Sequence, residues 1–190
     1  MATLQSRARA IRLRLLVLAV IVAASGLTLH AAVAAPTHGN RFEATFHETN
    51  ASITNRVADL GVFQLINTGS GTVEGYGPAT MVIGVTQDRS VQPCGPGSST
   101  NAAVRRIVLA AGVLVVRELA HVCPTALGPV ATGTWRVDGS SSTGVFAGAR
   151  GRGDATVHVA TGTATLTGKL KLAHEPTPEG LRALEEGSHK

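Results

Sequence analysis

The amino-acid sequence predicts an all-β protein, built as a single closed antiparallel barrel of eight or nine strands, with a compact β-sandwich as the alternative. Apolar and polar residues alternate with a period of two through much of the chain, as in strands that bury one face. Glycine separates short runs rich in Thr and Val, most clearly in residues 132–172. Charged residues make up only 15% of the chain, which favours a packed domain over disorder.

The N-terminal segment predicts export. Four arginines precede an apolar run at residues 15–24, and Ala32-Val33-Ala34 has the small-x-small pattern of a cleavage site. We therefore expect a cleaved signal peptide at residues 1–34 and a protein that is secreted or held in the cell envelope or periplasm. A retained membrane anchor is the alternative, but the uninterrupted apolar core is shorter than the ~18 residues of a spanning helix.

Removal of this segment changes the charge balance. The whole chain has 17 Lys and Arg against 12 Asp and Glu, but four of the arginines lie before residue 35. The remaining chain is nearly neutral, so its composition argues against nucleic acid as a partner. We expect the pairs Arg105-Arg106 and Arg150/Arg152 on the solvent side of strands or turns.

The expected barrel domain covers residues 35–174, and its first half contains four strands, two of which form a hairpin, and one connection. Residues 42–47 form the opening strand, and the more polar residues 51–60 are expected to be a loop or a short helix. Two further strands are expected to pair around a turn at Thr68-Gly69-Ser70. The strands expected in this half are residues 42–47, 61–67, 71–77 and 79–87. The side chains expected to share their buried faces are Phe42, Ala44, Phe46, Met81, Ile83 and Val85.

The second half begins with a long turn-forming segment, residues 88–101, which is rich in Pro, Gly and Ser. A very hydrophobic hairpin around Ala111-Gly112 follows. Its glycine and its many valines favour strands over a helix at residues 103–120. The strands expected in this half are residues 104–110, 113–123, 132–138, 144–148 and 163–172. Residues 175–190 are charged, start with two prolines and are expected to form a flexible tail.

The chain contains two cysteines, Cys94 and Cys123, both beyond the expected cleavage site. An even number of cysteines in an exported domain favours a disulfide between them. Closure of a loop of this length would stabilise the fold by roughly 3–4 kcal/mol. The alternatives are two reactive thiols or half of a metal site, but no second pair of Cys or His stands at ligand spacing.

No catalytic, metal-binding, cofactor-binding or phosphate-binding motif stands out. Neither Gly69-x-Gly71 nor Gly151-x-Gly153 completes a dinucleotide-binding pattern, so we interpret these residues as turn glycines. The tripeptide Arg152-Gly153-Asp154 matches an integrin-recognition sequence, but it lies in a glycine-rich turn pattern and is expected to be coincidental. We therefore expect no metal and no cofactor. The motifs by themselves identify no reaction.

One stretch of about 25 residues does carry a pattern. Its matching positions are Gly133, Thr134, Trp135, Val137, Gly139, Thr143, Gly144, Phe146, Gly148, Ala149, Gly151 and Gly153. This pattern resembles the late-strand signature of allene oxide cyclase and dirigent-like barrel proteins, and of exported bacterial relatives. The resemblance implies an eight-stranded barrel with an apolar interior that binds hydrophobic small molecules and guides cyclisation or coupling. It assigns no catalytic residue to this chain.

The leading functional hypothesis is a monomeric or weakly oligomeric barrel that binds a small apolar ligand in its interior. The residues expected to line that interior are Phe46, Phe63, Met81, Ile83, Leu114, Val116, Trp135 and Phe146. The alternative to ligand binding is a barrel that is filled by its own side chains and acts through its surface.

Two other classes of function stay open. The first is an isomerase or cyclase that polarises a lipid-like substrate with a buried polar residue, for which Glu118, Glu74 and Tyr76 are the candidates. The second is an envelope or adhesion protein that acts through residues 88–101. A filled interior would exclude both a binder and an enzyme. An open cavity supports binding, and an acid inside that cavity supports the enzyme.

Overall fold

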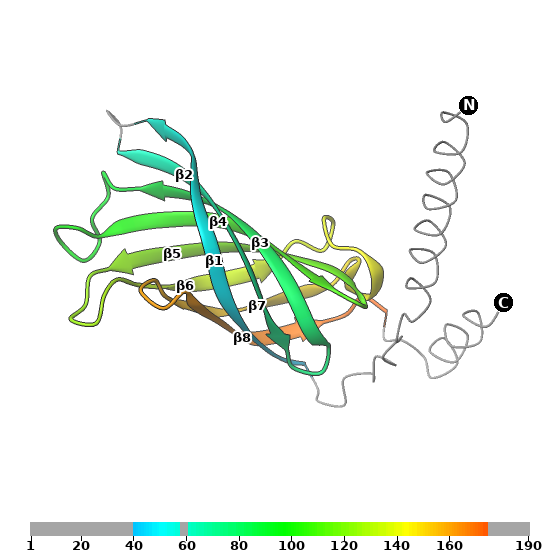
Figure 1. Ribbon diagram of the computed structural model, residues 1–190. Coiled ribbons are helices and arrows are strands. Elements are labelled where there is room, and N and C mark those ends of the chain that lie inside the picture. Colours follow the sequence, from blue (N-terminus) through cyan, green and yellow to red (C-terminus); the bar gives the residue numbers. More distant parts are fainter. Residues whose placement is uncertain (1–39, 58–60, 175–190) are drawn as a thin grey trace, which may run out of the picture. The chain divides into compact units, whose positions relative to one another are not determined.

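A computed structural model describes residues 40–57 and 61–174 of the chain. Eight antiparallel strands form a closed barrel in which each strand pairs with the next one in the sequence and β1 pairs with β8 (Figure 1). This confirms the predicted barrel and excludes the sandwich. The strands are β1 (Arg41–Val57), β2 (Val62–Val73), β3 (Gly77–Asp88), β4 (Ser99–Leu109), β5 (Gly112–Cys123), β6 (Val130–Val137), β7 (Arg150–His158) and β8 (Thr163–Lys171).

The expected signal peptide and C-terminal tail lie outside the described residues. In the part of the chain that is described, no helix is long and apolar enough to cross a membrane. One 3-10 turn, η2 (Gly144–Phe146), interrupts the connection between β6 and β7.

The up-and-down order of the strands gives the barrel two different ends. The β3–β4, β5–β6 and β7–β8 connections lie at one end, on the left in Figure 1, which we call the loop end. The β2–β3 and β4–β5 turns and the long β6–β7 connection lie at the other, which we call the hairpin end.

Three expected elements differ from the structure. Residues 51–57 continue strand β1 instead of forming a loop or helix. Strand β2 runs without a turn through residues 68–70, and the chain reverses at residues 74–76, where the Tyr76 amide donates to the Val73 carbonyl at 3.0 Å. The segment at residues 144–148 is the 3-10 turn and its surroundings, and the strand in this region is β7.

Several glycines that were expected to make turns lie inside strands. A Cβ atom added to Gly71 would collide with the Thr45 carbonyl oxygen of β1, and one added to Gly153 would collide with the Thr167 carbonyl oxygen of β8. Both positions require glycine because neighbouring backbones approach closely there. The Arg152-Gly153-Asp154 tripeptide therefore lies in a strand that is paired on both edges, not in a turn.

Large side chains fill the hairpin end of the barrel. Trp135 is 2% exposed, and its ring meets Phe42 edge to face at 5.1 Å between centroids. The 3-10 turn places Phe146 over this end, fully buried and 5.0 Å from the ring of Tyr76. Burial raises the pKa of the Tyr76 hydroxyl. Backbone hydrogen bonds from Thr143 to Val113 and from Asp138 to Val115, both 2.8 Å, hold the β6–β7 connection against β5.

The two cysteines form the predicted disulfide. Cys94 lies in the β3–β4 connection and Cys123 ends β5, with 5.6 Å between their Cα atoms. The Cys94 amide also donates to the Ser98 hydroxyl at 3.1 Å. The disulfide thus ties the long loop to the barrel wall beside the loop end.

Candidate functional site

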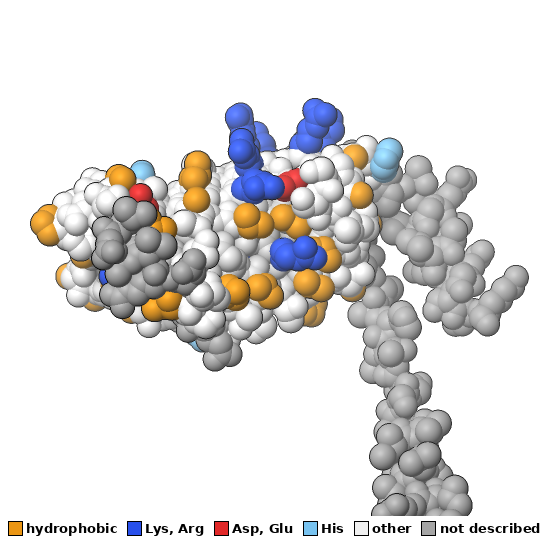
Figure 2. Space-filling view, turned by 90° about the horizontal axis from the view of Figure 1, so that it is seen from above, with side chains coloured by type: hydrophobic (Ala, Val, Ile, Leu, Met, Phe, Trp, Pro, Cys, Tyr) orange, Lys and Arg blue, Asp and Glu red, His pale blue; other side chains and the backbone are white. Residues whose placement is uncertain are grey.

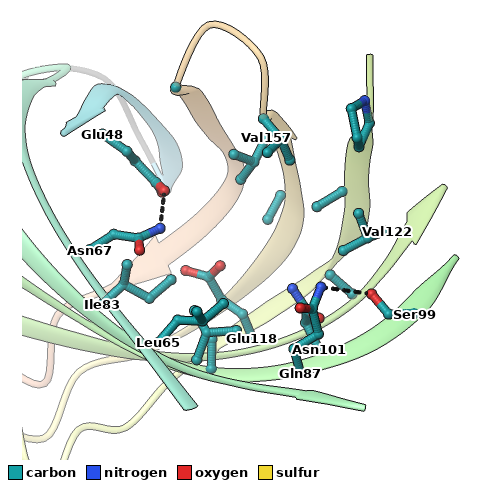
Figure 3. A pocket seen from close by; sticks show the side chains of 18 of the residues that line it. Glu48, Leu65, Asn67, Ile83, Gln87, Ser99, Asn101, Glu118, Val122 and Val157 are labelled. Atoms are coloured by element: carbon teal, nitrogen blue, oxygen red, sulfur yellow. Dashed lines mark hydrogen bonds between the residues drawn. The ribbon is translucent and has the colours of Figure 1, made fainter. Parts of the chain in front are cut away.

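The loop end of the barrel opens into a cavity of about 440 Å³. Residues of β1 to β7 line it, together with Gly162 in the connection to β8. The cavity is therefore surrounded by the barrel wall and lies along the barrel axis (Figure 3). The residues that line it are Glu48, Thr49, Leu65, Asn67, Ile83, Val85, Gln87, Arg89, Gly97, Ser99, Asn101, Ala103, Arg105, Glu118, Ala120, Val122, Pro129, Ala131, Ala155, Val157, Val159 and Gly162. Its volume is within the range of roughly 300–1,000 Å³ that is usual for small-molecule sites.

Strand alternation places these side chains inside. Glu48 has the same parity as Phe42 and Phe46 on β1, and Arg105 has the same parity as Ile107 on β4. Side chains two residues apart in a strand point to the same face. Polar groups on several strands therefore point inward along with the core residues.

A buried guanidinium lies between two carboxylates at the base of the cavity. The Arg105 Nε donates to Glu118 Oε1 at 2.6 Å, and Arg105 Nη2 approaches Glu118 Oε2 at 3.3 Å. The Arg105 Nη1 donates to Glu48 Oε1 at 2.9 Å. The side chains of Arg105, Glu118 and Glu48 are 0%, 6% and 9% exposed. We call these three residues the charge cluster.

The charge cluster rests on the core. The Nη1 atom of Arg105 lies 3.1 Å from the Met81 sulfur, and its guanidinium carbon lies 5.8 Å from the centroid of Phe46. Burial works to lower the pKa of Arg105, but the charges and hydrogen bonds of Glu118 and Glu48 outweigh it and raise that pKa above its usual value. Arg105 is therefore a permanent cation inside the barrel.

The floor of the cavity is rich in hydrogen-bond acceptors. The Asn67 Nδ2 donates to Glu48 Oε2 at 2.9 Å, which turns its own oxygen away from that bond (Figure 3). Among the described residues, Asn67 Oδ1 at the floor and Asn101 Oδ1, which lies nearer the loop end beside Gln87, are the buried side-chain atoms that have no hydrogen-bond partner. Buried acceptors of this kind are costly unless a donor reaches them. Two carboxylates also face a single guanidinium, so the floor carries excess negative charge.

The walls above this floor are mostly apolar. The apolar residues that form them are Leu65, Ile83, Val85, Ala103, Ala120, Val122, Ala131, Ala155 and Val157. Several of these are alanines, and their small side chains leave the loop end hollow, whereas Trp135, Phe42 and Phe146 fill the hairpin end. The arrangement suits a ligand with an apolar body and a polar group that points toward the charge cluster.

The residues predicted to line the interior are divided by the structure. Ile83 lines the cavity, and Phe46 and Met81 lie directly against the charge cluster. The Phe63 ring is buried and packs under Arg89, 4.7 Å from its guanidinium carbon. The remaining four belong to the buried core and do not line the cavity: Leu114, Val116, Trp135 and Phe146.

The three candidate catalytic residues lie in three different places. Glu118 lines the cavity and belongs to the charge cluster. Glu74 is exposed at the β2–β3 turn and borders a shallow depression with Glu43 and Thr45. Tyr76 is half-buried against Phe146 at the hairpin end. The structure therefore brings only Glu118 to the cavity.

Sequence reasoning missed Glu48, Asn67, Asn101 and Arg105. The expectation that Arg105 faces solvent was wrong, because Arg106 takes the outward position and Arg105 the inward one. The sequence did contain a pattern that indicates an inward Arg105: it stands two residues before Ile107 and four before Leu109, and side chains two residues apart in a strand share a face.

Within residues 40–57 and 61–174, no group of three or more His, Cys, Asp or Glu side chains is arranged to hold a metal ion. Comparisons with protein-family models, with curated proteins and with solved structures found no match to this chain.

Proposed function

We propose that this protein binds a small, largely apolar molecule that carries a hydrogen-bond-donating group, such as an amine or a hydroxyl. The ligand occupies the cavity at the loop end, with its donor group toward the charge cluster. The observation that carries the proposal is the combination of apolar walls with two buried acceptors that have no partner: Asn67 Oδ1, beside Glu48 at the floor, and Asn101 Oδ1, nearer the loop end. A ligand donor that reaches Asn67 Oδ1, beside the charge cluster, would satisfy it.

The charge of the cavity floor determines which polar group the ligand can carry. Glu48 and Glu118 together outweigh Arg105, and the nitrogens of Arg105 that form hydrogen bonds already face these carboxylates and Met81. A ligand carboxylate would meet like charges, whereas an ammonium or hydroxyl group would meet acceptors. The proposal therefore favours amines and alcohols over fatty acids.

Two further observations support this proposal. The resemblance to allene oxide cyclase and dirigent-like barrels implies hydrophobic ligands. The disulfide between Cys94 and Cys123 supports function in an oxidising compartment, as export would provide.

A matched pair of phenylalanine variants tests the cavity. Ala103 is half-buried and faces the cavity, whereas its neighbour Ala102 is exposed on the outer face of β4. We expect Ala103→Phe to weaken binding of dodecylamine and dodecanol by about tenfold or more, because the ring occupies the space of the ligand. Ala102→Phe should leave binding unchanged. Laurate, with the same chain length, should bind more weakly than either ligand in the unmodified protein.

Calorimetric titration of the full chain measures these affinities, and native mass spectrometry of the purified protein searches for a retained ligand. Equal effects of the two phenylalanine variants would exclude the cavity as the binding site. Tighter binding of laurate than of dodecylamine would refute the proposed donor group and leave the cavity itself in place.

The charge cluster also favours a second candidate function, an isomerase or cyclase for a lipid-like substrate. A buried carboxylate in an apolar cavity can serve as a general base, and Glu118 holds that position. With the epoxide of an unsaturated fatty alcohol as the probe, which carries no carboxylate, we expect turnover that Glu118→Gln lowers by about 10²–10⁴-fold. Glu74→Gln, on the outside of the barrel, is the control. Chromatography of the products measures turnover, and no product from the unmodified protein would reject an enzyme for this substrate class.

A further inference from the structure

A row of basic side chains crosses the outer surface of the barrel, on the opposite face of the strands from the cavity. Strand register places Arg117 opposite Arg136, Arg136 opposite Arg152, Arg152 opposite Lys169, and Lys169 opposite Arg41. Five cations thus occupy directly paired positions on β5, β6, β7, β8 and β1. All five side chains are exposed. We call them the basic ladder.

The basic ladder is unfavourable for folding. Side chains that directly face each other on neighbouring strands lie about 4.5–5.5 Å apart at Cβ, and like charges at such positions destabilise a sheet. A second pair, Arg150 opposite Lys171, adds two exposed cations beside Arg152 and Lys169. A surface that concentrates repulsion in this way is explained by a partner that supplies the opposite charge.

Acidic residues neutralise the ends of the ladder but not its centre. Arg41 pairs with Glu43 at 2.7 Å, and Arg117 pairs with Asp138 at 2.6 Å. Within the described part of the chain, no carboxylate lies within ion-pair distance of Arg136, Arg152 or Lys169. Asp154 is the acidic neighbour on the same face of β7, and it is paired in register with two threonines. The three central cations are therefore available to an anion.

The shape of the ladder selects the kind of anion. Neighbouring strands lie about 4.8 Å apart, so the ladder presents one cation at each such step in a single line. It passes over five of the eight strands and so curves around about half of the barrel. A flat membrane or a stiff duplex would reach only a few of these cations at once. A flexible chain with one charge on each unit can follow all of them.

The aromatic residues decide between flexible polyanions. Proteins that bind single-stranded nucleic acids combine basic grooves with exposed aromatic rings on which the bases stack. Here Phe42, Phe46, Phe63, Trp135 and Phe146 are buried, and Tyr76 is half-buried against Phe146. The outer face in Figure 2 shows projecting Lys and Arg side chains, with few acidic ones between them. Within residues 40–57 and 61–174, this surface therefore offers no fully exposed aromatic ring on which a base could stack.

We propose that the basic ladder binds an unbranched acidic polysaccharide, one that carries a carboxylate or sulfate on nearly every sugar unit. The polymer lies across the strands and places successive anionic groups on Lys169, Arg152 and Arg136. This interaction is separate from ligand binding in the cavity and does not depend on it.

The test uses the full chain and polygalacturonate as the probe, with binding measured by biolayer interferometry at low and at physiological ionic strength. The triple variant Arg136→Gln, Arg152→Gln and Lys169→Gln should lose about tenfold or more in affinity, and its salt dependence should become shallower. Arg152→Gln alone should cost a measurable part of this loss. Arg106→Gln is the matched control, since Arg106 is also an exposed arginine on the outer face, on β4.

Thermal unfolding monitored by circular dichroism shows whether the triple variant is folded, and we expect an unchanged or higher melting temperature because repulsion is removed. Neutral dextran should not bind. The proposal is overturned if Arg106→Gln weakens binding as much as Arg152→Gln, or if the unmodified protein does not bind polygalacturonate. It is also overturned if oligothymidylate or vesicles of anionic phospholipid bind more tightly in a ladder-dependent manner.

Discussion

Replacement of Arg105 by methionine is expected to cost about 3–5 kcal/mol of unfolding free energy at neutral pH. The substitution keeps the bulk of the side chain but removes the cation between Glu118 and Glu48, which lie 2.6 and 2.9 Å from its nitrogens. Two buried carboxylates then face each other without a partner. This is the costly situation for charges in a low-dielectric interior, more costly than the absence of all three charges.

The loss should depend on pH in a defined direction. In the Arg105→Met variant the folded state gains by keeping a proton on one of the carboxyl groups, so acid favours it. The stability difference from the unmodified protein should narrow as the pH falls from neutral toward the range where free glutamate titrates, and widen as the pH rises. Urea unfolding at a series of pH values measures this.

Two controls accompany the Arg105 variant. Arg106→Met changes an exposed arginine at the next position and should stay within about 0.5 kcal/mol. The triple variant Arg105→Met, Glu118→Gln and Glu48→Gln removes every charge of the cluster and should recover much of the loss. A deficit that is independent of pH, or one that the triple variant does not reduce, would contradict the role assigned to the charge cluster.

Replacement of Trp135 by alanine is expected to cost a similar amount, about 3–5 kcal/mol, for a different reason. Its ring is almost completely buried against Phe42, and its Nε1 lies 3.1 Å from both the Asp154 and Thr167 carbonyl oxygens. A Cβ atom at Gly168 would approach the indole to 2.9 Å, so the wall of the barrel is shaped around this ring. Alanine would leave a cavity that such a wall cannot fill.

Trp135→Phe separates the two contributions, because it keeps most of the packing and removes only the N–H donor. It should lose less than half as much stability as Trp135→Ala. Val157→Ala, which removes methyl groups from the wall of an existing cavity, should lose the least. Since Trp135 is the only tryptophan of the chain, circular dichroism must replace fluorescence as the probe of unfolding. Equal losses for Trp135→Ala and Val157→Ala would contradict a filled hairpin end.

Much of the fold could be predicted from the sequence. Alternation alone placed Met81, Ile83 and Val85 on one face of β3, and the cysteine count alone predicted the Cys94–Cys123 disulfide. Strand ends were less predictable because glycine has two roles. Gly69 and Gly71 resemble turn residues in the sequence, but the close approach of β1 to β2 requires them inside a strand.

The site was harder to predict than the fold. Glu118 was named as a candidate, but Arg105 was expected in solvent because arginine is rarely buried without partners. Its partners come from strands that are remote in the sequence, since Glu48 lies 57 residues away. The register between neighbouring strands is fixed by the turns and by closure of the barrel, and no local sequence pattern contains that information.

The sequence by itself determined that this chain forms antiparallel strands with one buried face, which residues share that face, and which cysteines pair. These properties follow from side-chain alternation and from composition, both of which are local. Only the tertiary structure decided between the closed barrel and the sandwich, and only it showed that one end is filled by Trp135 and Phe146 while the other is hollow. It also decided that Glu48, Arg105 and Glu118 meet inside, and that cations on five strands align outside, because both depend on the register between strands.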